Sequence, residues 1–318
     1  MKVTVVGAGG NVGSTVALSV AQRDFAKEVV ALDLERKVED KTFYPSKGRA
    51  LDQWQVSPID LFDTRVKGTT DYADTANSDI CVITAGVPRR PGMSRDDLLS
   101  INANIVESVT KELVKYSPDT ILIIVSNPLD VMVQVAKDAS GLPYEKVMGM
   151  AGILDTARYR AFIAEEINVS PKDIQAMLMG GHGDTMVPLP RFTTVSGLPI
   201  SHFITDERLN EIVERAKKGG GELVGLMGTS AWYAPGIAAA QMVEAILLDQ
   251  DRIFPVCAHL DGEFGVDDLY IGVPVKLGKG GVKEIIEVAL TDSEKELLNN
   301  SVKHVRGTLD AFKALMVK

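Results

Sequence analysis

A histidine between two glycines is the clearest candidate for proton transfer in this sequence. It lies in Gly181-His182-Gly183-Asp184, directly after an apolar run. Glycine on both sides lets the backbone approach a ligand closely. A lone histidine is more often structural than catalytic, and we expect the structural role for His202, His259 and His304, which have no such setting.

A carboxylate and a guanidinium lie three residues apart in a predicted helix, in Asp155-Thr156-Ala157-Arg158. Residues with this spacing share one helical face, so both side chains can point into one cleft. The alternative is an ion pair on the protein surface, which is common at this spacing. The motif alone therefore leaves both interpretations open.

A third group of residues could bind an anion. Arg89, Arg90 and Arg95 lie on one loop that contains two prolines and a glycine, after a predicted strand. Three arginines on one loop repel each other unless an anion is present; the alternative is a solvated basic loop. Ligands of doubly wound sheets bind where strands end. Asn127 ends another strand at this edge, and Pro128 is predicted to start the next helix.

A glycine-rich turn follows the first predicted strand and opens the first helix. It comprises Gly7, Ala8, Gly9, Gly10, Asn11, Val12 and Gly13. In this context glycines allow a sharp turn and close approach to a pyrophosphate, and the helix N-terminus offers free N–H groups. One glycine is extra, since either Gly9 or Gly10 can serve as the middle member, so the path of the loop stays open.

Asp33 ends the second predicted strand, about 20 residues beyond the loop, where an acidic side chain binds the adenosine ribose. Its charge would repel a 2′-phosphate, so the sequence favours NAD over NADP. The alternative is an ordinary turn residue at a strand end. The segment 35–49 is long and polar, and it leaves the adenosine side of the pocket undefined.

The elements that must position these residues form two groups. Short β-branched runs alternate with amphipathic helices in the first half, which predicts a parallel sheet covered on both faces. We therefore expect an α/β protein with a Rossmann doubly wound sheet at 1–146 and an α+β catalytic domain at 147–318. The predicted strands of the first half are Val3–Val6, Glu28–Asp33, Asp79–Thr84 and Thr120–Ser126, and its predicted helices are Val12–Arg23 and Asp96–Tyr116.

The second half has a mixed pattern that ends in a long helix. A capping box of Ser293 and Glu296 is predicted to start that helix. One buried face is predicted by an apolar stripe through Leu298, Val302, Val305, Leu309, Phe312 and Met316. The other elements expected here are the helices Ala151–Ile167 and Ile237–Leu248 and the strand-like runs Ile174–Met179, Met186–Leu189, Phe192–Val195, Ile253–His259 and Tyr270–Leu277.

Composition excludes several classes of protein. The chain has 318 residues, 45 % apolar and 24 % charged, as in ordinary globular proteins. Its net charge of −9 argues against a nucleic-acid or anionic-membrane surface, and no apolar run is long enough for a membrane span. The two cysteines, Cys81 and Cys257, suggest neither disulfides nor a metal site. We expect a cytoplasmic protein.

Taken together, these motifs resemble the lactate/malate dehydrogenase family. The glycine loop, Asp33, the arginine loop, Ser126-Asn127-Pro128, Leu154–Arg158 and Gly181–Asp184 come in the family's order, over essentially the whole chain. Within the family the chain looks most like the lactate-dehydrogenase-like malate dehydrogenases.

The resemblance implies a role for each matching residue. His182 would exchange a proton with the C2 oxygen, and Asp155 would hold its ring and stabilise the imidazolium. Arg158 would bind the C1 carboxylate, and Arg95 would stabilise charge on the C2 oxygen. Contacts to the cofactor would come from Asn102, Val125, Ser126 and Asn127, and Asn127 would also reach the substrate.

The implied reaction is the NAD-dependent oxidation of (S)-malate to oxaloacetate. L-Lactate is the second candidate for the substrate. The residue that discriminates between the two is Arg89, because the resemblance places a glutamine at this position in lactate enzymes. A catalytically silent NAD-binding sensor is a third, although it would not need His182, Asp155 and Arg158 together. By analogy we expect a homo-oligomer, with a tetramer favoured over a dimer.

Overall fold

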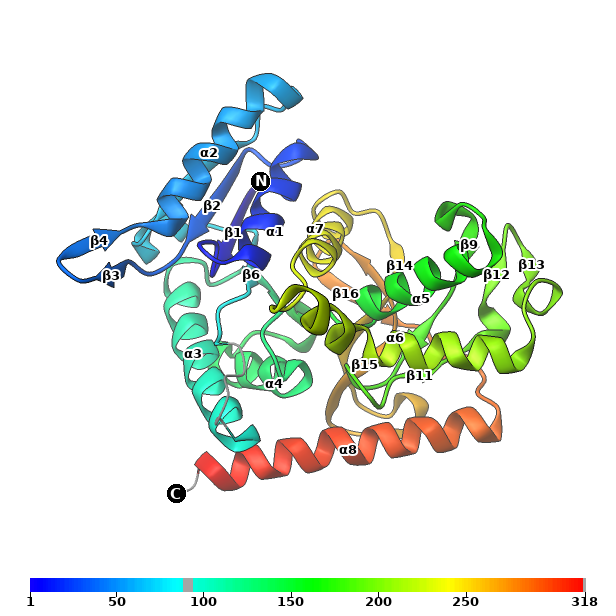
Figure 1. Ribbon diagram of the computed structural model, residues 1–318. Helices are drawn as coiled ribbons and strands as arrows, with labels where there is room; N and C mark the ends of the chain where they lie inside the picture. Colours follow the sequence, from blue (N-terminus) through cyan, green and yellow to red (C-terminus); the bar gives the residue numbers. More distant parts are fainter. Residues whose placement is uncertain (88–93, 317–318) are drawn as a thin grey trace.

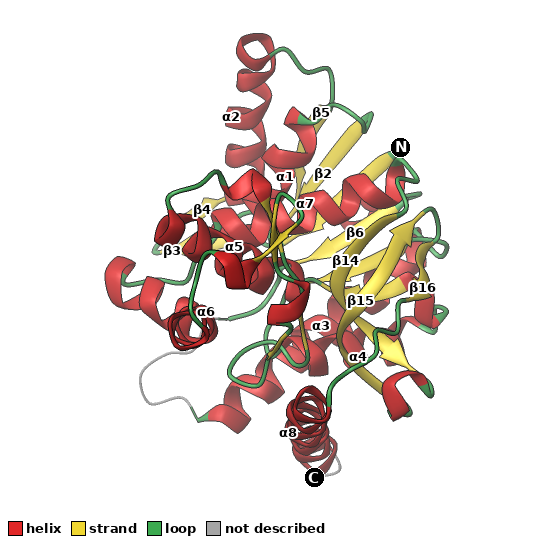
Figure 2. Cartoon of the chain, turned by 90° about the vertical axis from the view of Figure 1, so that its right-hand side faces the viewer, coloured by secondary structure: helices red, strands yellow, loops and turns green. Residues whose placement is uncertain are grey.

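One twisted sheet runs through the whole molecule (Figures 1 and 2). The computed structural model describes residues 1–87 and 94–316. In spatial order the strands of this sheet are β16 (Gly281–Ile285), β15 (Leu269–Gly278), β14 (Arg252–Leu260), β8 (Val147–Gly149), β7 (Ile121–Ile124), β6 (Ile80–Ile83), β1 (Lys2–Val6), β2 (Glu28–Leu32) and β5 (Arg65–Thr69). The six strands from β8 to β5 pair in parallel, and the other three are antiparallel.

Helices cover both faces of the sheet, as the alternating pattern predicts. The helices are α1 (Asn11–Gln22), α2 (Pro45–Asp60), α3 (Arg95–Tyr116), α4 (Leu129–Ser140), α5 (Gly152–Ile167), α6 (Asp206–Met227), α7 (Tyr233–Leu247) and α8 (Asp292–Met316). On one face α3, α4 and α8 pack together, while α7 contacts both α1 and α5 on the other. The long α8 runs along the bottom of Figure 1, beneath α3 and α4.

The centre of the sheet is apolar on both sides. Every residue of β6 and β7 is buried, because helices cover both faces of these strands. The predicted Rossmann class is therefore confirmed. The sheet is continuous, and its parallel part ends at Gly149, so the expected division of the chain at residue 146 stays a prediction.

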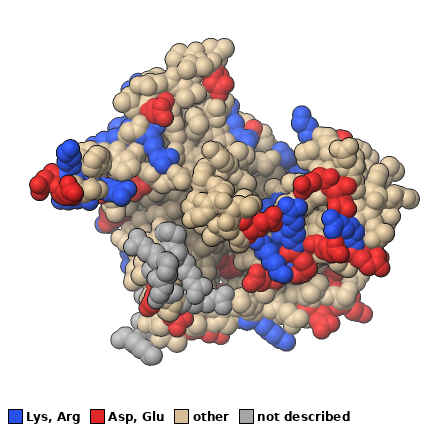
Figure 3. Space-filling view, viewed as in Figure 1, with Lys and Arg blue, Asp and Glu red and all other residues tan. Residues whose placement is uncertain are grey.

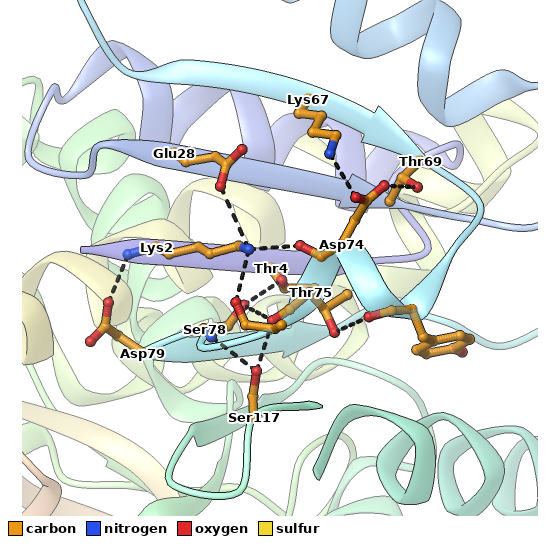
Figure 4. A network of polar contacts seen from close by, with 12 residues as sticks. Lys2, Thr4, Glu28, Lys67, Thr69, Asp74, Thr75, Ser78, Asp79 and Ser117 are labelled. Atoms are coloured by element: carbon orange, nitrogen blue, oxygen red, sulfur yellow. Dashed lines mark hydrogen bonds and ion pairs between the residues drawn. The ribbon is translucent and has the colours of Figure 1, made fainter. Parts of the chain in front are cut away.

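A polar network ties β1 to the segments that flank β6 (Figure 4). The Lys2 ammonium donates to the carbonyl oxygens of Asp74 and Ala76 at 2.7 and 2.9 Å. The hydroxyls of Thr4 and Ser78 are 2.7 Å apart, and the amide of Ser78 donates to Ser117. These contacts satisfy buried polar groups beside the sheet and fix the strands whose carboxyl ends form the site.

Short strands and α6 build the part of the second half that lies beside the sheet. The strands are β9 (Ile174–Gln175), β10 (Leu178–Met179), β11 (Val187–Pro188), β12 (Thr194–Val195) and β13 (Leu198–Pro199). Ile174–Met179 is therefore two strands rather than one. Three glycines, residues 219–221, interrupt the apolar pattern of α6, which explains why that helix was not predicted. A second apolar core, with Tyr159 and Ile163 of α5, lies here.

The predicted capping box of the last helix was wrong by two residues. The amide of Glu294 donates to the Thr291 hydroxyl at 3.3 Å, and the amide of Thr291 donates to the Glu294 carboxylate at 2.8 Å. The same spacing of a hydroxyl and a carboxylate occurs at Ser293 and Glu296, so the sequence could not separate the two registers. The predicted buried stripe is confirmed at Leu298, Val305 and Leu309, and Val302 and Phe312 are partly buried against the same core. The side chain of Met316 lies outside the described residues.

Charges of both signs are interleaved over α5 and α6 on the face shown in Figure 3. Ion pairs join Arg208 to Glu166 and Arg215 to Glu165. Such exposed pairs add little to stability. Within the described ranges, no helix is long and apolar enough to cross a membrane.

Candidate active site

The glycine loop connects β1 to α1 through tight backbone contacts. Gly7 has a φ of +83°, and its carbonyl oxygen accepts the amide of Gly10 at 3.0 Å. A Cβ at Gly13 would lie 2.5 Å from that oxygen, so only glycine lets the helix pack this closely on the strand. Gly10 caps α1 without a side-chain contact, which leaves N–H groups of the first turn available to an anion.

The position of the Asp33 side chain accounts for Gly9, the additional glycine of the loop. Its Oδ2 accepts the amide of Gly9 at 2.8 Å, and its Oδ1 accepts the amide of Leu34 at 2.7 Å. A Cβ at Gly9 would lie 2.8 Å from the same Oδ2 and 2.9 Å from Pro45. Gly9 therefore makes room for the carboxylate at the end of β2, while Gly7 and Gly13 provide the contact between strand and helix.

The polar segment after Asp33 is a hairpin followed by the start of α2. Its strands are β3 (Arg36–Val38) and β4 (Lys41–Phe43). From α2, Arg49 reaches back and donates to the Asn11 side chain at 2.8 Å. Because of this contact a guanidinium lies beside the glycine loop, a feature that the sequence analysis missed.

Asn102 connects three segments at the carboxyl edge of the sheet. Its side chain is buried and accepts the amide of Val87 at 2.8 Å while donating to the carbonyl of Asn127 at 2.7 Å. Ser126 donates its hydroxyl to the carbonyl of Ala85. The residues after β6 and β7 are thereby held together, and the exposed Asn127 stands at the end of β7.

The structure brings His182, Asp155 and Arg158 together. His182 Nδ1 lies 2.9 Å from Asp155 Oδ2, and Arg158 Nη1 lies 3.4 Å from Asp155 Oδ1. Asp155 is only 2 % exposed, so the pair is not a surface ion pair. Nδ1 donates to the carboxylate, which leaves Nε2 as the atom available to a substrate.

Arg158 keeps a donor free for a ligand. Its buried Nε has no hydrogen-bond partner among the residues that the structure describes. Buried guanidinium donors are normally paired, so this atom suits an anionic ligand. Above it, Gly219 of α6 provides space, because a Cβ there would lie 3.1 Å from Arg158 Cδ.

Opposing effects act on the pKa of His182. Burial lowers this pKa, whereas the charge and hydrogen bond of Asp155 and the charge of Asp130 raise it, and the net pKa lies above its ordinary value. The imidazolium form therefore persists to a higher pH than in a free histidine. A histidine whose imidazolium is stabilised in this way suits acid–base catalysis.

Two cavities meet at His182 and Asn127. The first, of about 800 Å³, also contains Asp155 and Arg158, with Lys217 from α6. The second, of about 630 Å³, lies between α3, α4 and α8. A third cavity of about 820 Å³ lies at the amino ends of the parallel strands, near Asp79, and the described residues that line it include neither histidine nor arginine. Ligands of doubly wound sheets bind at the carboxyl ends, which favours the first two.

The arginine loop is only partly described. Arg89 and Arg90 lie outside the described residues, and so does the side chain of Arg95, whose backbone begins α3. A capping box of Ser94 and Asp97 fixes the start of α3, at 3.0 and 3.1 Å. Across the described residues, no group of histidine, cysteine and carboxylate side chains could hold a metal ion.

Family models match both halves of the chain. The lactate/malate dehydrogenase NAD binding domain matches residues 1–149, and the lactate/malate dehydrogenase alpha/beta C-terminal domain matches residues 153–316. This chain belongs to the lactate/malate dehydrogenase family. The resemblance inferred from the motifs is therefore confirmed.

Named relatives cover nearly the full length. The malate dehydrogenase of Salinibacter ruber is 60 % identical over 315 residues, which is 99 % of this chain and 98 % of the relative. Its solved structure matches with a TM-score of 0.93 at 58 % identity, covering 99 % of both chains. The lactate dehydrogenase of Cryptosporidium parvum, solved with lactic acid and NAD, matches with a TM-score of 0.91 at 38 % identity over 98 % of both chains.

Proposed function

We propose that this chain catalyses the NAD-dependent interconversion of (S)-malate and oxaloacetate. The observation that carries the proposal is the group of His182, Asp155 and Arg158, in which a histidine held at 2.9 Å by a buried carboxylate lies near a guanidinium with an unpaired donor. A proton-transfer group beside a carboxylate-binding group is what the oxidation of a 2-hydroxy acid requires.

The residues at the sheet edge fit NAD. Gly7, Gly10 and Gly13 allow close backbone approach to a pyrophosphate at the N-terminus of α1, and Asp33 is anchored where it can accept from ribose hydroxyls. When bound, NAD supplies or takes the hydride at C2 of the substrate. In our proposal Asn102 acts by holding the backbone of Asn127, because its side chain is already engaged.

In the proposed mechanism His182 transfers the proton. During reduction its Nε2–H donates to the keto oxygen, and during oxidation the neutral ring accepts the proton of the hydroxyl. Asp155 keeps the proton on Nδ1 and stabilises the imidazolium. Arg158 binds the C1 carboxylate through paired N–H donors, and this fixes C2 in place.

The arginine loop decides the substrate in this proposal. Arg95 stabilises charge on the C2 oxygen, and Arg89 binds the second carboxylate of a four-carbon substrate. The fold does not distinguish malate from lactate enzymes, since structures named for both activities match with TM-scores of 0.93 and 0.91. L-Lactate therefore stays the second candidate, and Arg89 is the residue that argues against it.

The direct test is an initial-rate assay. We expect the purified protein to oxidise NADH with oxaloacetate, and kcat/KM for pyruvate to be lower by about a hundredfold or more. Equal or faster turnover of pyruvate would show that the substrate is lactate rather than malate. No turnover of either keto acid, with NADH still bound, would favour the sensor.

We also propose a homotetramer. Apolar side chains are exposed on α2 and on α6 and α7, with Ile59 at 81 %, Leu226 at 78 % and Tyr233 at 66 % exposure. We attribute this exposure to surfaces that further copies of the chain cover. Light scattering should give about four times the 34.3 kDa chain mass; a concentration-independent monomer would contradict the proposal.

We also propose that the enzyme is cytoplasmic and that its reaction belongs to the tricarboxylic acid cycle.

A further inference from the structure

Three different elements hold three consecutive amides of the loop that contains His182. The amide of Gly180 donates to Gly272 of β15 at 2.7 Å, and the amide of Gly181 donates to the Ser301 hydroxyl of α8 at 2.7 Å. The amide of His182 itself donates to Asp130 Oδ2 at 3.2 Å. The first two partners are neutral, whereas the third brings a carboxylate next to the proton-transfer residue.

Asp130 is placed and oriented by its surroundings. It lies in the first turn of α4, where the helix dipole favours an anion. The Cys257 thiol of β14 donates to Asp130 Oδ1 at 3.3 Å. Burial and the charge of Asp130 raise the pKa of Cys257 well above its usual range, so the thiol stays protonated and remains a donor. Both carboxylate oxygens of Asp130 therefore have a partner.

We propose that Asp130 is a positioning residue for His182, which fixes the backbone of the histidine and supplies a second negative charge that stabilises its imidazolium. The proposal rests on His182 as the proton-transfer group. It assigns a task to a buried carboxylate that the sequence analysis did not single out, and it explains why Cys257 faces this carboxylate.

Other charged groups line the two cavities that meet at His182, and the experiment must hold them constant. On the described elements around the two cavities these groups are Asp155 and Arg158 of α5, Lys217 and Lys218 of α6, Asp96 of α3, Lys303 and His304 of α8, and Asp184 of the loop itself. The Asp130→Asn substitution leaves all of them in place and still offers an oxygen to the amide of His182.

The direction of the expected change in the pH dependence of kcat/KM follows from the negative charge of Asp130. Reduction of oxaloacetate needs imidazolium, so kcat/KM falls as the pH rises through the pKa of His182. Burial raises the pKa of Asp130 above its ordinary value, and the charge of His182 is the largest effect that lowers it, so protonation of either group affects the other. Without the Asp130 charge the imidazolium is less stable, and the fall in kcat/KM should begin at a lower pH.

The experiment compares Asp130→Asn with Asp138→Asn, a matched control on the same helix with an exposed carboxylate. In Asp130→Asn the ratio of kcat/KM for oxaloacetate at about pH 9 to that at about pH 6 should fall by about threefold or more relative to wild type. The KM for NADH and the ratio in Asp138→Asn should be unchanged.

NMR titration gives a readout that does not depend on catalysis. The chain has four histidines, so the imidazole signal of His182 can be assigned by its loss in His182→Asn. Its midpoint should move to lower pH in Asp130→Asn and stay in place in Asp138→Asn. A shifted signal with unshifted kinetics would show that His182 is not the catalytic acid, which separates failure of the proposed function from failure of this inference.

An unshifted His182 signal in Asp130→Asn would overturn the inference. Asp130→Ser, which keeps a hydroxyl acceptor without charge, provides a second neutral variant and should show the same shift. If neither neutral variant folds while Asp138→Asn does, the carboxylate serves stability, and the inference also fails.

Discussion

The glycine loop and the loop that carries His182 are both held tightly, but by different means. Residues 7–13 are fixed largely by one another and by Leu32 and Asp33, through backbone contacts and missing side chains. The His182 loop is fixed by Asp130, Gly272 and Ser301, which lie far away along the chain. The glycine loop is thus held mainly by its own backbone and by the end of the neighbouring strand β2, whereas the His182 loop is held by three elements that lie far from it along the chain.

This difference distinguishes the region proposed to bind the cofactor from the region proposed to transfer the proton. The glycine loop offers backbone N–H groups and a shape, so its function depends on which residues have no side chain. The His182 loop offers one titrating ring whose proton affinity is set by side chains from several elements. Substitutions in the two regions should therefore change different measured quantities.

The largest effect is expected from His182→Asn. Loss of the proposed proton-transfer group should lower kcat by about 10²–10⁴-fold while NADH binding persists, because the proposed contacts to the cofactor lie in the other region. Quenching of tryptophan fluorescence by NADH measures the binding. The control is His202→Asn, at an exposed histidine far from both cavities, which should retain wild-type turnover. A His182→Asn variant with more than about a tenth of wild-type kcat would contradict the assignment.

A smaller effect is expected from Asp33→Ser, which changes the choice of cofactor rather than the chemistry. Removal of the carboxylate removes both its ribose contact and its repulsion of a 2′-phosphate. The NAD/NADP ratio of kcat/KM should narrow by about tenfold or more, equivalent to roughly 1.4 kcal/mol. Asp40→Ser, in the exposed hairpin turn, should leave the ratio unchanged. An unaltered ratio in Asp33→Ser would show that this residue does not bind the ribose.

The smallest effect is expected from Gly219→Ala, which tests the space above Arg158. The added Cβ would lie 3.1 Å from Arg158 Cδ, so the guanidinium must shift by a few tenths of an ångström. The KM for oxaloacetate should rise by about threefold or more, since small misplacements of a substrate-binding group are costly.

Gly225→Ala is the matched control for this variant, because Gly225 does not line the cavity that contains Arg158. It lies on the same helix, and its added Cβ meets nothing within 4 Å. Its KM should stay unchanged, and its stability should rise by up to about 1 kcal/mol because alanine favours the helix. Equal KM values in the two variants would mean that Gly219 does not set the position of Arg158.

The sequence was most informative where structure depends on neighbouring residues. The strands β1, β2, β6 and β7 and the helices α1, α3 and α5 were predicted within one or two residues, because buried β-branched runs and helical periodicity are local signals. The dinucleotide loop was recognised for the same reason. The role of Gly9 was not, since it depends on the packing of the Asp33 side chain.

The catalytic half was harder to read from residues alone. Asp155 and Arg158 could have been a surface pair until burial showed otherwise. Asp130 and Ser301 carry no motif that connects them to His182, because only folding brings them within hydrogen-bond distance. Cys257 carries no such motif either; it is buried, and it donates a hydrogen bond to Asp130. Resemblance to a family supplied what local patterns could not.

The proposal that the substrate is a four-carbon dicarboxylate depends on Arg89. Closure around pyruvate would leave this guanidinium buried without a partner, at a cost of about 3–5 kcal/mol, which corresponds to a preference of about 10²–10³ or more for oxaloacetate. Replacement by glutamine removes the repulsive element together with the attractive one. Arg90, one residue along the loop, has no role in this proposal.

The most direct test measures kcat/KM for oxaloacetate and for pyruvate in wild type, Arg89→Gln and Arg90→Gln. We predict that Arg89→Gln loses most of its activity on oxaloacetate and gains on pyruvate, so that the ratio of the two values falls by about a hundredfold or more. Arg90→Gln should change this ratio far less. A switch of specificity in Arg90→Gln but not in Arg89→Gln, or an unchanged ratio in both, would contradict the account.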